Sequence, residues 1–415
     1  MTSVFEITYL RIAIVDCVID ASYSGLHWGG HKMTNARVFK AGTLAVLALL
    51  MMWTSSMAQV KVGVVTAATG PGAALGIPFK NTFSILPKTL GGLEVQYIVL
   101  DDATDPTNAV KFARKLVLED HVDILIGSSS LPAAMAMTDL SAESKTPQIA
   151  LTPLGPAAAK NPWVFSVVQP PLVMIGAVVD HMRAQGVKNV AYIGFSDSWG
   201  DIVLAALKVH AEAAGIKIVT DERYARLDTN VTGQILKILS TKPDAVMIGA
   251  TNTAGALPDI ALSERGFKGK VYNDQGVMTE DFLRVGGKSI EGIVAPAGPV
   301  TVAEQLPDSH PIKKVAVDFT KLYETTFGPG KRTAASAFSY DAYLLADRAV
   351  ATAAKAAKPG TPEFRQAVRD ALEATTELVG THAVYNMSPT DHNGGGDKRA
   401  VVLVTVESGA WKLLR

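Results

Sequence analysis

Short apolar runs alternate with amphipathic segments from residue 60 onward, and this alternation limits the fold more than any other feature of the sequence. The runs have the length and branching of buried strands. The segments between them, such as 108–119, place their apolar residues on one face of a helix. Such alternation predicts an α/β fold in which helices cover both faces of parallel sheets.

The same pattern gives a provisional map of elements. The predicted strands are 60–65, 95–100, 124–126, 190–194, 216–220, 245–249, 269–272, 382–385 and 400–407. The predicted helices are a broken one at 77–90, one ending at Gly186, and those at 108–119, 202–213, 231–239, 256–264, 312–327, 335–357 and 362–375. Turn residues interrupt the alternation at 169–171 and 295–299, which predicts two lobes between which the chain crosses more than once.

Composition and charge exclude some partners. The 415 residues are 48% hydrophobic and 19% charged, enough to bury a sizeable core in two or three domains. Lysine and arginine together number 39, as do aspartate and glutamate, so no net charge attracts a polyanion. We therefore expect no nucleic-acid partner.

Residues 33–58 have the features of a signal peptide. Arg37 and Lys40 give a basic start, 41–53 an apolar core, and 56–58 a small-x-small cleavage site. The core is shorter than the roughly 20 residues of a membrane span. The mature chain is therefore expected to be exported after cleavage near Ala58.

Residues 1–32 fit poorly in front of such a signal peptide. We expect translation to begin at Met33, and an extended leader is the alternative. The single cysteine, Cys17, lies in this upstream segment, so the mature chain is expected to contain no disulfide.

Hydroxyl side chains gather where one buried apolar run ends. Gly127 ends that run, and Ser128, Ser129 and Ser130 follow it. Pro132 then suits a first helical turn, which places the serines on a strand-to-helix turn. Backbone N–H groups and the helix dipole favour a bound anion there, and a carboxylate would fit. The alternative is that a serine caps the helix and no ligand binds.

Residues after the other predicted strands extend this pattern, because ligands in open α/β sheets lie beyond the carboxyl ends of strands. The first unit offers hydroxyls and backbone donors, and the second offers an aromatic ring and amides. These residues are Thr69, Thr152, Leu154 and Gly155, and then Trp199, Asn252, Asp274 and Gln275. A polar clamp facing Trp199 predicts a small, flat or apolar molecule with one anionic end. Core packing is the alternative role for Trp199.

Signatures of catalysis are weak. Gly194-Phe-Ser-Asp-Ser198 begins like a nucleophile elbow but lacks the closing glycine. His382 and His392 lie in a turn-rich segment without the spacing of metal ligands, so a solvated loop is expected there. The glycines at 394–396 are not followed by the Lys-Ser/Thr of a phosphate-binding loop. We therefore expect no enzyme, no metal site and no cofactor.

Several short motifs occur in order along 60–415. They are Thr69-Gly-Pro71, Tyr97 to Asp105-Pro106 with Asp101-Asp102, Ile126-Gly-Ser-Ser, Tyr224-Ala-Arg, Pro243-Asp-Ala-Val, and Glu291-Gly after Gly286-Gly287. Each string is weak alone. Their order and spacing together resemble the periplasmic substrate-binding proteins of ABC importers, in the leucine/isoleucine/valine-binding, type I group.

The resemblance implies two Rossmann-like lobes, joined by three hinge crossings, that close on a ligand. After the leader at 1–58, it places 59–171 and 299–379 in the N-terminal lobe. It places 172–298 and 380–415 in the C-terminal lobe. It also implies a monomer that captures a small carboxylate and delivers it to the membrane permease of an ABC transporter.

The resemblance also assigns the carboxylate end of the site. In amino-acid-binding members, the turn matched by Ser128–Ser130 and the loop matched by Thr152, Leu154 and Gly155 hold the ligand carboxylate. Pro156 departs from the family near a position that donates an N–H elsewhere. This chain must therefore depend more on its serines.

The second lobe departs from amino-acid-binding relatives, in which an acidic residue holds the ligand's amino group. The matching position is Gln275, beside Asp274, and a neutral amide cannot neutralise a buried ammonium. Leu75 stands where relatives place an aromatic ring, and Trp199 matches the second-lobe aromatic. This implies an aromatic or apolar monocarboxylate, such as a benzoate. A shift of one residue would put Asp274 in the site and favour a branched-chain amino acid.

Two other classes of function stay open at this point. A ligand-sensing receptor module uses the same fold, and an exported α/β enzyme would convert the bound compound instead of returning it unchanged. The predicted signal peptide and the lack of a DNA-binding segment favour the importer component.

Overall fold

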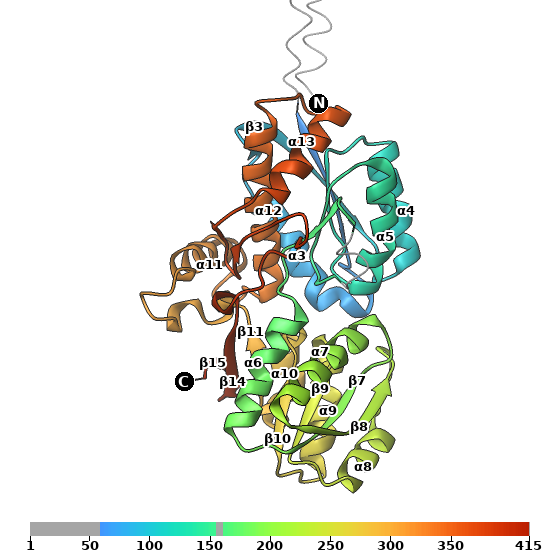
Figure 1. Cartoon of the computed structure of the whole chain (residues 1–415), viewed down its shortest axis with the longest axis vertical. Coiled ribbons are helices and arrows are strands. Elements are labelled where there is room, and N and C mark those ends of the chain that lie inside the picture. The colour runs from blue at the N-terminus through green and yellow to red at the C-terminus, as the bar shows by residue number, and fades with distance from the viewer. Residues whose placement is uncertain (1–58, 155–160, 415) are drawn as a thin grey trace, which may run out of the picture. The chain divides into compact units, whose positions relative to one another are not determined.

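A computed structural model of the protein describes residues 59–154 and 161–414, so the predicted signal peptide and Gly155 lie outside the described residues. Two large, mainly parallel sheets with their helices and one small two-stranded antiparallel sheet make up the described part (Figure 1). This confirms the predicted α/β fold with two Rossmann-like lobes.

The first lobe is built on a six-stranded sheet in the order β2-β3-β1-β4-β5-β6, in which β2 is antiparallel and the other pairs are parallel. Chain winding reverses between β1 and β4, because β1 leads to β3 on one side and β3 leads to β4 on the other. The strands are β1 (Val60–Thr66), β2 (Thr89–Leu90), β3 (Leu93–Asp101), β4 (Ile124–Gly127), β5 (Gln148–Ala150) and β6 (Val164–Ser166). The helices are η2 (Gly70–Gly72), α3 (Ala73–Ile85), α4 (Pro106–Leu118) and α5 (Leu131–Ser144).

The second lobe is built on a seven-stranded sheet in the order β15-β14-β11-β10-β9-β7-β8. Strands β7 to β11 are parallel, β14 and β15 are antiparallel, and winding reverses between β7 and β9. The strands are β7 (Asn189–Phe195), β8 (Lys217–Tyr224), β9 (Ala245–Gly249), β10 (Lys270–Asn273), β11 (Val294–Ala297), β14 (Val402–Glu407) and β15 (Ala410–Leu413). The helices are α6 (Pro171–Ala184), α7 (Ser198–Ala214), α8 (Thr232–Ser240), α9 (Asn252–Glu264), η4 (Gln275–Val277), α10 (Glu280–Gly286) and η5 (Gly287–Ile290).

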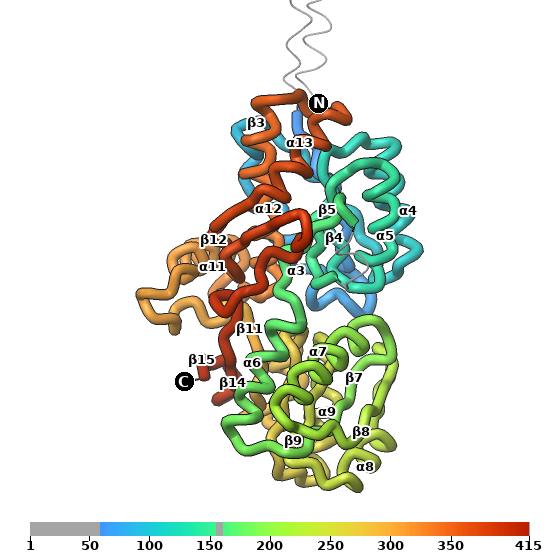
Figure 2. The backbone as a smooth tube through the Cα atoms, in the orientation of Figure 1, coloured from blue at the N-terminus to red at the C-terminus, as the bar shows by residue number. Residues whose placement is uncertain are grey.

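The chain passes between the two sheets three times, after β6, after β11 and before β14. Helix α12 packs against α3, and α13 packs against α12, although α3 is far away in the sequence; Figure 2 shows these late segments beside the first lobe. The lobe boundaries near 171, 298 and 379 stay a prediction. The elements between the second and third passages are η6 (Pro299–Gln305), α11 (Lys313–Phe327), α12 (Ala334–Ala353), α13 (Pro362–Glu373), β12 (Leu378–Val379), β13 (Val384–Tyr385) and η7 (Lys398–Ala400).

Some element boundaries differ from the predicted ones, and local chemistry explains the differences. Helix α7 begins at Ser198 rather than 202, because the Asp197 carboxylate accepts the first free N–H groups of the helix. The predicted pause at 295–299 contains most of β11, including Pro296. Helix α3 ends at Ile85, so the predicted helix at 77–90 extended too far.

Buried polar side chains connect the three passages between the sheets. Gln169 follows β6, Gly298 follows β11, and His382 precedes β14. Nε2 of Gln169 lies 3.4 Å from Nδ1 of His382, and a Cβ at Gly298 would come within 1.8 Å of that Nδ1. Asp341 on α12 accepts the backbone N–H of His382 at 3.0 Å. The passages therefore share one tightly packed network, in which only glycine fits at position 298.

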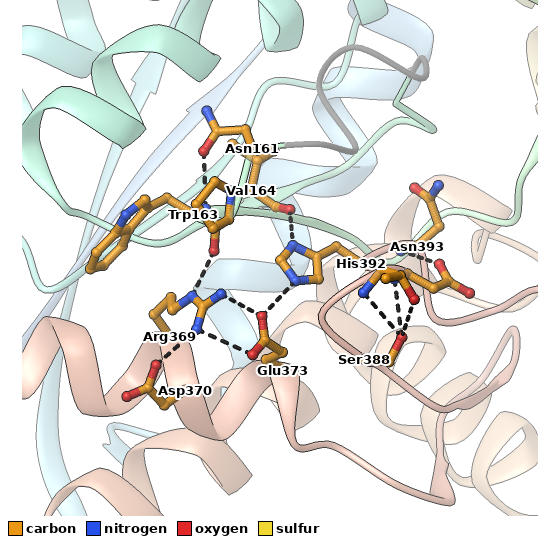
Figure 3. Close-up of polar contacts among 12 residues, drawn as sticks. Asn161, Trp163, Val164, Arg369, Asp370, Glu373, Ser388, His392 and Asn393 are labelled. Atoms are coloured by element: carbon orange, nitrogen blue, oxygen red, sulfur yellow. Dashed lines mark hydrogen bonds and ion pairs between the residues drawn. The ribbon is translucent and has the colours of Figure 1, made fainter.

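The two histidines near the C-terminus are buried, which corrects the predicted solvated loop. Nδ1 of His392 lies 2.9 Å from the Val164 carbonyl oxygen and Nε2 lies 3.1 Å from Glu373 (Figure 3). Burial lowers the pKa of His382 to about 3, so this ring is neutral at physiological pH. His392 thus connects the C-terminal segment to strand β6 of the first lobe. His382 connects it to α12, because its Nε2 contacts the carbonyl oxygen of Ala334.

Candidate ligand-binding site

The serines after β4 lie at the point where the winding of the first sheet reverses. Ser128 donates from Oγ to Asp102 at 2.5 Å, and both side chains are buried. Oγ of Ser129 accepts the backbone N–H of Ala67 at 2.9 Å and the Thr66 hydroxyl at 3.3 Å. These hydrogen bonds join the end of β4 to the end of β1 and hold the turn rigidly.

Gly127 is required at this turn by its backbone conformation and by space. Its φ is +117°, where residues with a side chain are strained, and a Cβ would come within 1.9 Å of the Val65 carbonyl oxygen. The close approach of β4 to β1 therefore depends on this glycine.

Ser130 differs from its two neighbours. It occupies the N-cap position of α5, but its side chain accepts no capping hydrogen bond. Among the residues that the structure describes, its Oγ atom has no hydrogen-bond partner. The N-terminus of α5 therefore places this hydroxyl beside the positive end of the helix dipole.

The second sheet places Trp199 in the first turn of α7. The indole Nε1–H donates to Asp274 at 3.0 Å, and the backbone N–H of Gly276 donates to the other oxygen of Asp274 at 2.6 Å. Asp274 is fully buried, and burial raises the pKa of its carboxyl to about 7 despite these two donors. Both oxygens of this carboxyl are therefore occupied behind the indole ring.

Two amides follow β9 and β10. Asn252, the first residue of α9, donates from Nδ2 to the carbonyl oxygen of Pro71 in the first lobe at 3.5 Å. Within the described part of the chain, its Oδ1 atom and both polar atoms of the Gln275 side chain lack a hydrogen-bond partner. Both residues are buried, with exposed fractions of 3% for Asn252 and 8% for Gln275.

An arginine lies at the same edge of the second sheet. Nε of Arg226 pairs with Asp197 at 2.5 Å, and Nη1 donates to the Thr251 hydroxyl at 3.2 Å. The guanidinium also lies over the ring of Phe195, 4.3 Å from the ring centroid. Its position is therefore fixed by three contacts.

Several of these residues surround one cavity between the two sheets, which we call the central cavity. The centre of a water molecule can move within a volume of about 70 Å³ inside the cavity. A cavity of this size suits a small molecule. Its apolar wall includes Leu75, Phe79 and Met278, with Phe338 from α12. Ser129, Ser130 and Thr152 line it from the first lobe, and Trp199, Arg226, Thr251, Asn252 and Gln275 line it from the second.

Seven of the predicted site residues line the central cavity: Leu75, Ser129, Ser130, Thr152, Trp199, Asn252 and Gln275. Four others do not line it. Thr69 is exposed, Ser128 is held by Asp102, Leu154 packs in a small core cluster, and Asp274 lies behind Trp199. Gly155 lies outside the described residues.

Sequence reasoning missed other lining residues. Arg226 and Thr251 each lie two residues after the end of a strand, β8 and β9, so the rule of strand ends could have found them. Phe79 and Phe338 come from helices α3 and α12 and carry no strand-end signal.

Two features are absent from the described residues, a cluster of metal-binding side chains and a helix that could cross a membrane. In 59–154 and 161–414, no group of three or more His, Cys, Asp or Glu side chains is placed to hold a metal ion. Over the same ranges, no helix has both the length and the apolar character needed to cross a membrane.

Two lobes of parallel sheet whose strand ends enclose one small cavity define a two-lobed ligand-binding protein. The chain belongs to the periplasmic binding protein family, which matches residues 59–410. This confirms the resemblance found in the sequence motifs.

Known proteins extend this result. The Leu/Ile/Val-binding protein BraC3 of Rhizobium johnstonii is 24% identical over 352 residues, which are 82% of this chain and 90% of that protein. An extracellular ligand-binding receptor from Rhodopseudomonas palustris is 41% identical, with a TM-score of 0.83, over 86% of this chain and 100% of the other. A solute-binding protein of an ABC transporter from R. palustris, solved in complex with benzoate, is 21% identical with a TM-score of 0.71, over 86% and 95%.

Proposed function

We propose that this protein captures a small aromatic or apolar carboxylate in the central cavity and delivers it to an ABC permease. The observation that carries the proposal is the cavity itself, where the strand ends of two sheets meet around apolar side chains and hydrogen-bond donors. A ligand held by both lobes would favour the closed form through its contacts with each of them.

The first-lobe end of the cavity supports binding of the carboxylate. Ser130 offers a hydroxyl without a partner among the described residues, next to the positive end of the α5 dipole. Ser129 and Thr152 line the same end. Charge-assisted hydrogen bonds from such donors to a carboxylate are roughly twice as strong as neutral ones.

The apolar wall supports an aromatic or aliphatic body. Leu75, Phe79 and Phe338 line the cavity together with the indole ring of Trp199. Burying such a body contributes about 25 cal/mol for each Å² removed from water. The benzoate complex of a relative shows that this fold accommodates an aromatic monocarboxylate, although at 21% identity the likeness extends to the fold alone.

The absence of an acidic side chain on the cavity wall, among the described residues, argues against an α-amino group in the ligand. Gln275 lines the cavity and is neutral, whereas Asp274 already accepts hydrogen bonds from Trp199 and Gly276. Leaving an ammonium buried without a partner would cost several kcal/mol. A branched-chain amino acid is the second candidate, because the buried Asp274 carboxyl is one hydrogen bond away from the cavity wall.

Thermal unfolding of the mature protein tests the proposal. We expect benzoate or phenylacetate to raise the unfolding midpoint, and leucine or valine to leave it unchanged. Stabilisation by leucine and not by the aromatic acids would contradict the proposed ligand. Mass spectrometry after incubation should recover the added acid unchanged, whereas a converted product would indicate an enzyme.

The proposal also includes the place and partners of the protein. Export through the signal peptide at 33–58, cleaved near Ala58, would bring the mature chain to the periplasm, where the permease is accessible. We propose that it acts there as a monomer. N-terminal sequencing of secreted protein and its mass in solution test these two points.

A further inference from the structure

We propose that the ligand carries a hydroxyl group besides its carboxylate, and that the Gln275 side chain recognises this hydroxyl at the second-lobe end of the central cavity. The inference rests on the proposed function, because it assumes that the same cavity binds a carboxylate.

The Gln275 side chain is the first observation. It is 8% exposed and lines the cavity, yet among the described residues neither Nε2 nor Oε1 has a hydrogen-bond partner. Buried side-chain amides are nearly always hydrogen-bonded in folded proteins. An amide has one donor end and one acceptor end, so its full satisfaction requires a group that both accepts and donates.

Asn252 gives an independent observation at the same end. Its Nδ2 faces the Pro71 carbonyl oxygen, which fixes the direction of the amide. The opposite atom, Oδ1, is buried and lacks a partner within the described part of the chain. This atom can only accept, so a ligand group that meets it must donate a hydrogen.

Other polar groups fit this end less well. An ammonium would lie near the guanidinium of Arg226 and the positive end of the α9 dipole, which both disfavour a cation. A second carboxylate would be attracted there, but it has no hydrogen for Oε1 of Gln275 or Oδ1 of Asn252. A purely apolar end would leave these atoms unpaired. A hydroxyl carries no charge, and it can accept from Nε2 of Gln275 while it donates its single hydrogen to either Oε1 of Gln275 or Oδ1 of Asn252.

Matched pairs of acids test this inference on the wild-type protein. Benzoate is compared with 3- and 4-hydroxybenzoate, and hexanoate with 6-hydroxyhexanoate, by isothermal titration calorimetry. In at least one pair we expect the hydroxylated acid to bind about tenfold more tightly, the usual effect of one buried hydrogen bond.

Variants locate the origin of the preference. Gln275→Met keeps the length of the side chain but removes its hydrogen bonds, so the preference should fall to within about twofold. Ser130→Ala, at the carboxylate end, should weaken both members of a pair alike and leave their ratio unchanged. Gln366→Met makes the same chemical change on the exposed face of α13, far from Gln275 in the sequence. It should alter the affinity for neither the plain nor the hydroxylated acid.

Two results would overturn the inference while leaving the proposed function standing. Plain acids could bind the wild-type protein as tightly as their hydroxylated partners in both pairs. The preference could also persist in Gln275→Met. The proposed function itself fails on a different result, namely that leucine is the only tested compound that binds or that none of them binds. In that case both proposals are wrong. If Gln275→Met does not fold, the wild-type ratios decide the question.

Discussion

The two ends of the central cavity differ in how their polar groups are used. At the first-lobe end, the Ser129 hydroxyl is held by hydrogen bonds with Ala67 and Thr66. The Ser130 hydroxyl beside it has no partner among the described residues. At the second-lobe end, Gln275 and Asn252 lie buried, and three of their polar atoms have no partner within 59–154 and 161–414.

This difference indicates which end of the cavity is rigid and which end can select among ligands. A turn that is already held by the hydrogen bonds of Ser128 and Ser129 needs little reorganisation when an anion arrives, which favours affinity for any carboxylate. Amides that depend on the ligand for their hydrogen bonds penalise every molecule that cannot supply them. We therefore propose that the first lobe supplies general carboxylate affinity and that the second lobe selects the ligand.

The largest expected effect on binding comes from Trp199→Ala. This change removes the indole wall and one of the two donors to the buried Asp274 carboxyl. Affinity for benzoate or its hydroxylated forms should fall by about 2 kcal/mol or more, roughly 30-fold. Calorimetry measures the change, and Trp411→Ala on β15 is the matched control, expected to lower stability but not affinity. Unchanged affinity in Trp199→Ala would show that the indole ring does not contact the ligand.

A change of ligand class is expected from Gln275→Glu. The new carboxylate would supply the counter-charge that an α-amino group needs, so leucine affinity should rise by about tenfold and affinity for hydroxybenzoate should fall. Titration of both ligands into both proteins measures the exchange. If Gln275→Glu gains nothing for leucine, the second lobe does not select the ligand in the way we propose.

Two neighbouring serines should respond differently to the same substitution. Ser129→Ala leaves the buried N–H of Ala67 unpaired, so it should lower the free energy of unfolding by about 1–3 kcal/mol. Ser130→Ala breaks no internal hydrogen bond of its side chain in the described residues. It should change stability by less than about 0.5 kcal/mol and weaken carboxylate binding by about tenfold. Equal losses of stability in the two variants would contradict the contrast.

The smallest expected effect on ligand binding concerns pH and Asp259, a buried residue of α9, because it acts on the stability of the fold. Burial raises the pKa of this carboxyl to about 8, with one hydrogen bond from Asn273 opposing the shift. Its contribution to stability is therefore fully present below its ordinary pKa of 3.8 and is lost as pH rises through about 8. We expect the unfolding midpoint to fall between about pH 4 and about pH 8, and to fall less in Asp259→Asn. An equal fall in both proteins would assign the pH dependence to other groups.

The sequence predicted the two-lobed α/β fold because the alternation of strands and helices is local and strong. The predicted boundaries of helices and strands were less accurate where an N-cap residue sets the start of a helix, as Asp197 does for α7. They were also less accurate where a strand contains a proline, as β11 does at Pro296. The burial of His382 and His392 could not be predicted, because their partners Ala334 and Val164 are supplied by distant segments.

The candidate site was predictable to the extent that it is built from strand ends. Ser129, Ser130 and Gln275 each follow a strand that the apolar pattern identifies. The aromatic rings of Phe79 and Phe338 reach the cavity from helices, and a helix face toward a ligand has the same sequence pattern as one toward the core. Three-dimensional packing was needed to distinguish the two.

A crystal structure with 4-hydroxybenzoate tests the central claim most directly. We predict that its carboxylate lies within hydrogen-bond distance of the Ser130 hydroxyl and that the ring lies against Trp199. The phenolic hydroxyl should then meet the Gln275 amide. A ligand bound in the opposite direction, or bound elsewhere while the central cavity stays empty, would contradict the account.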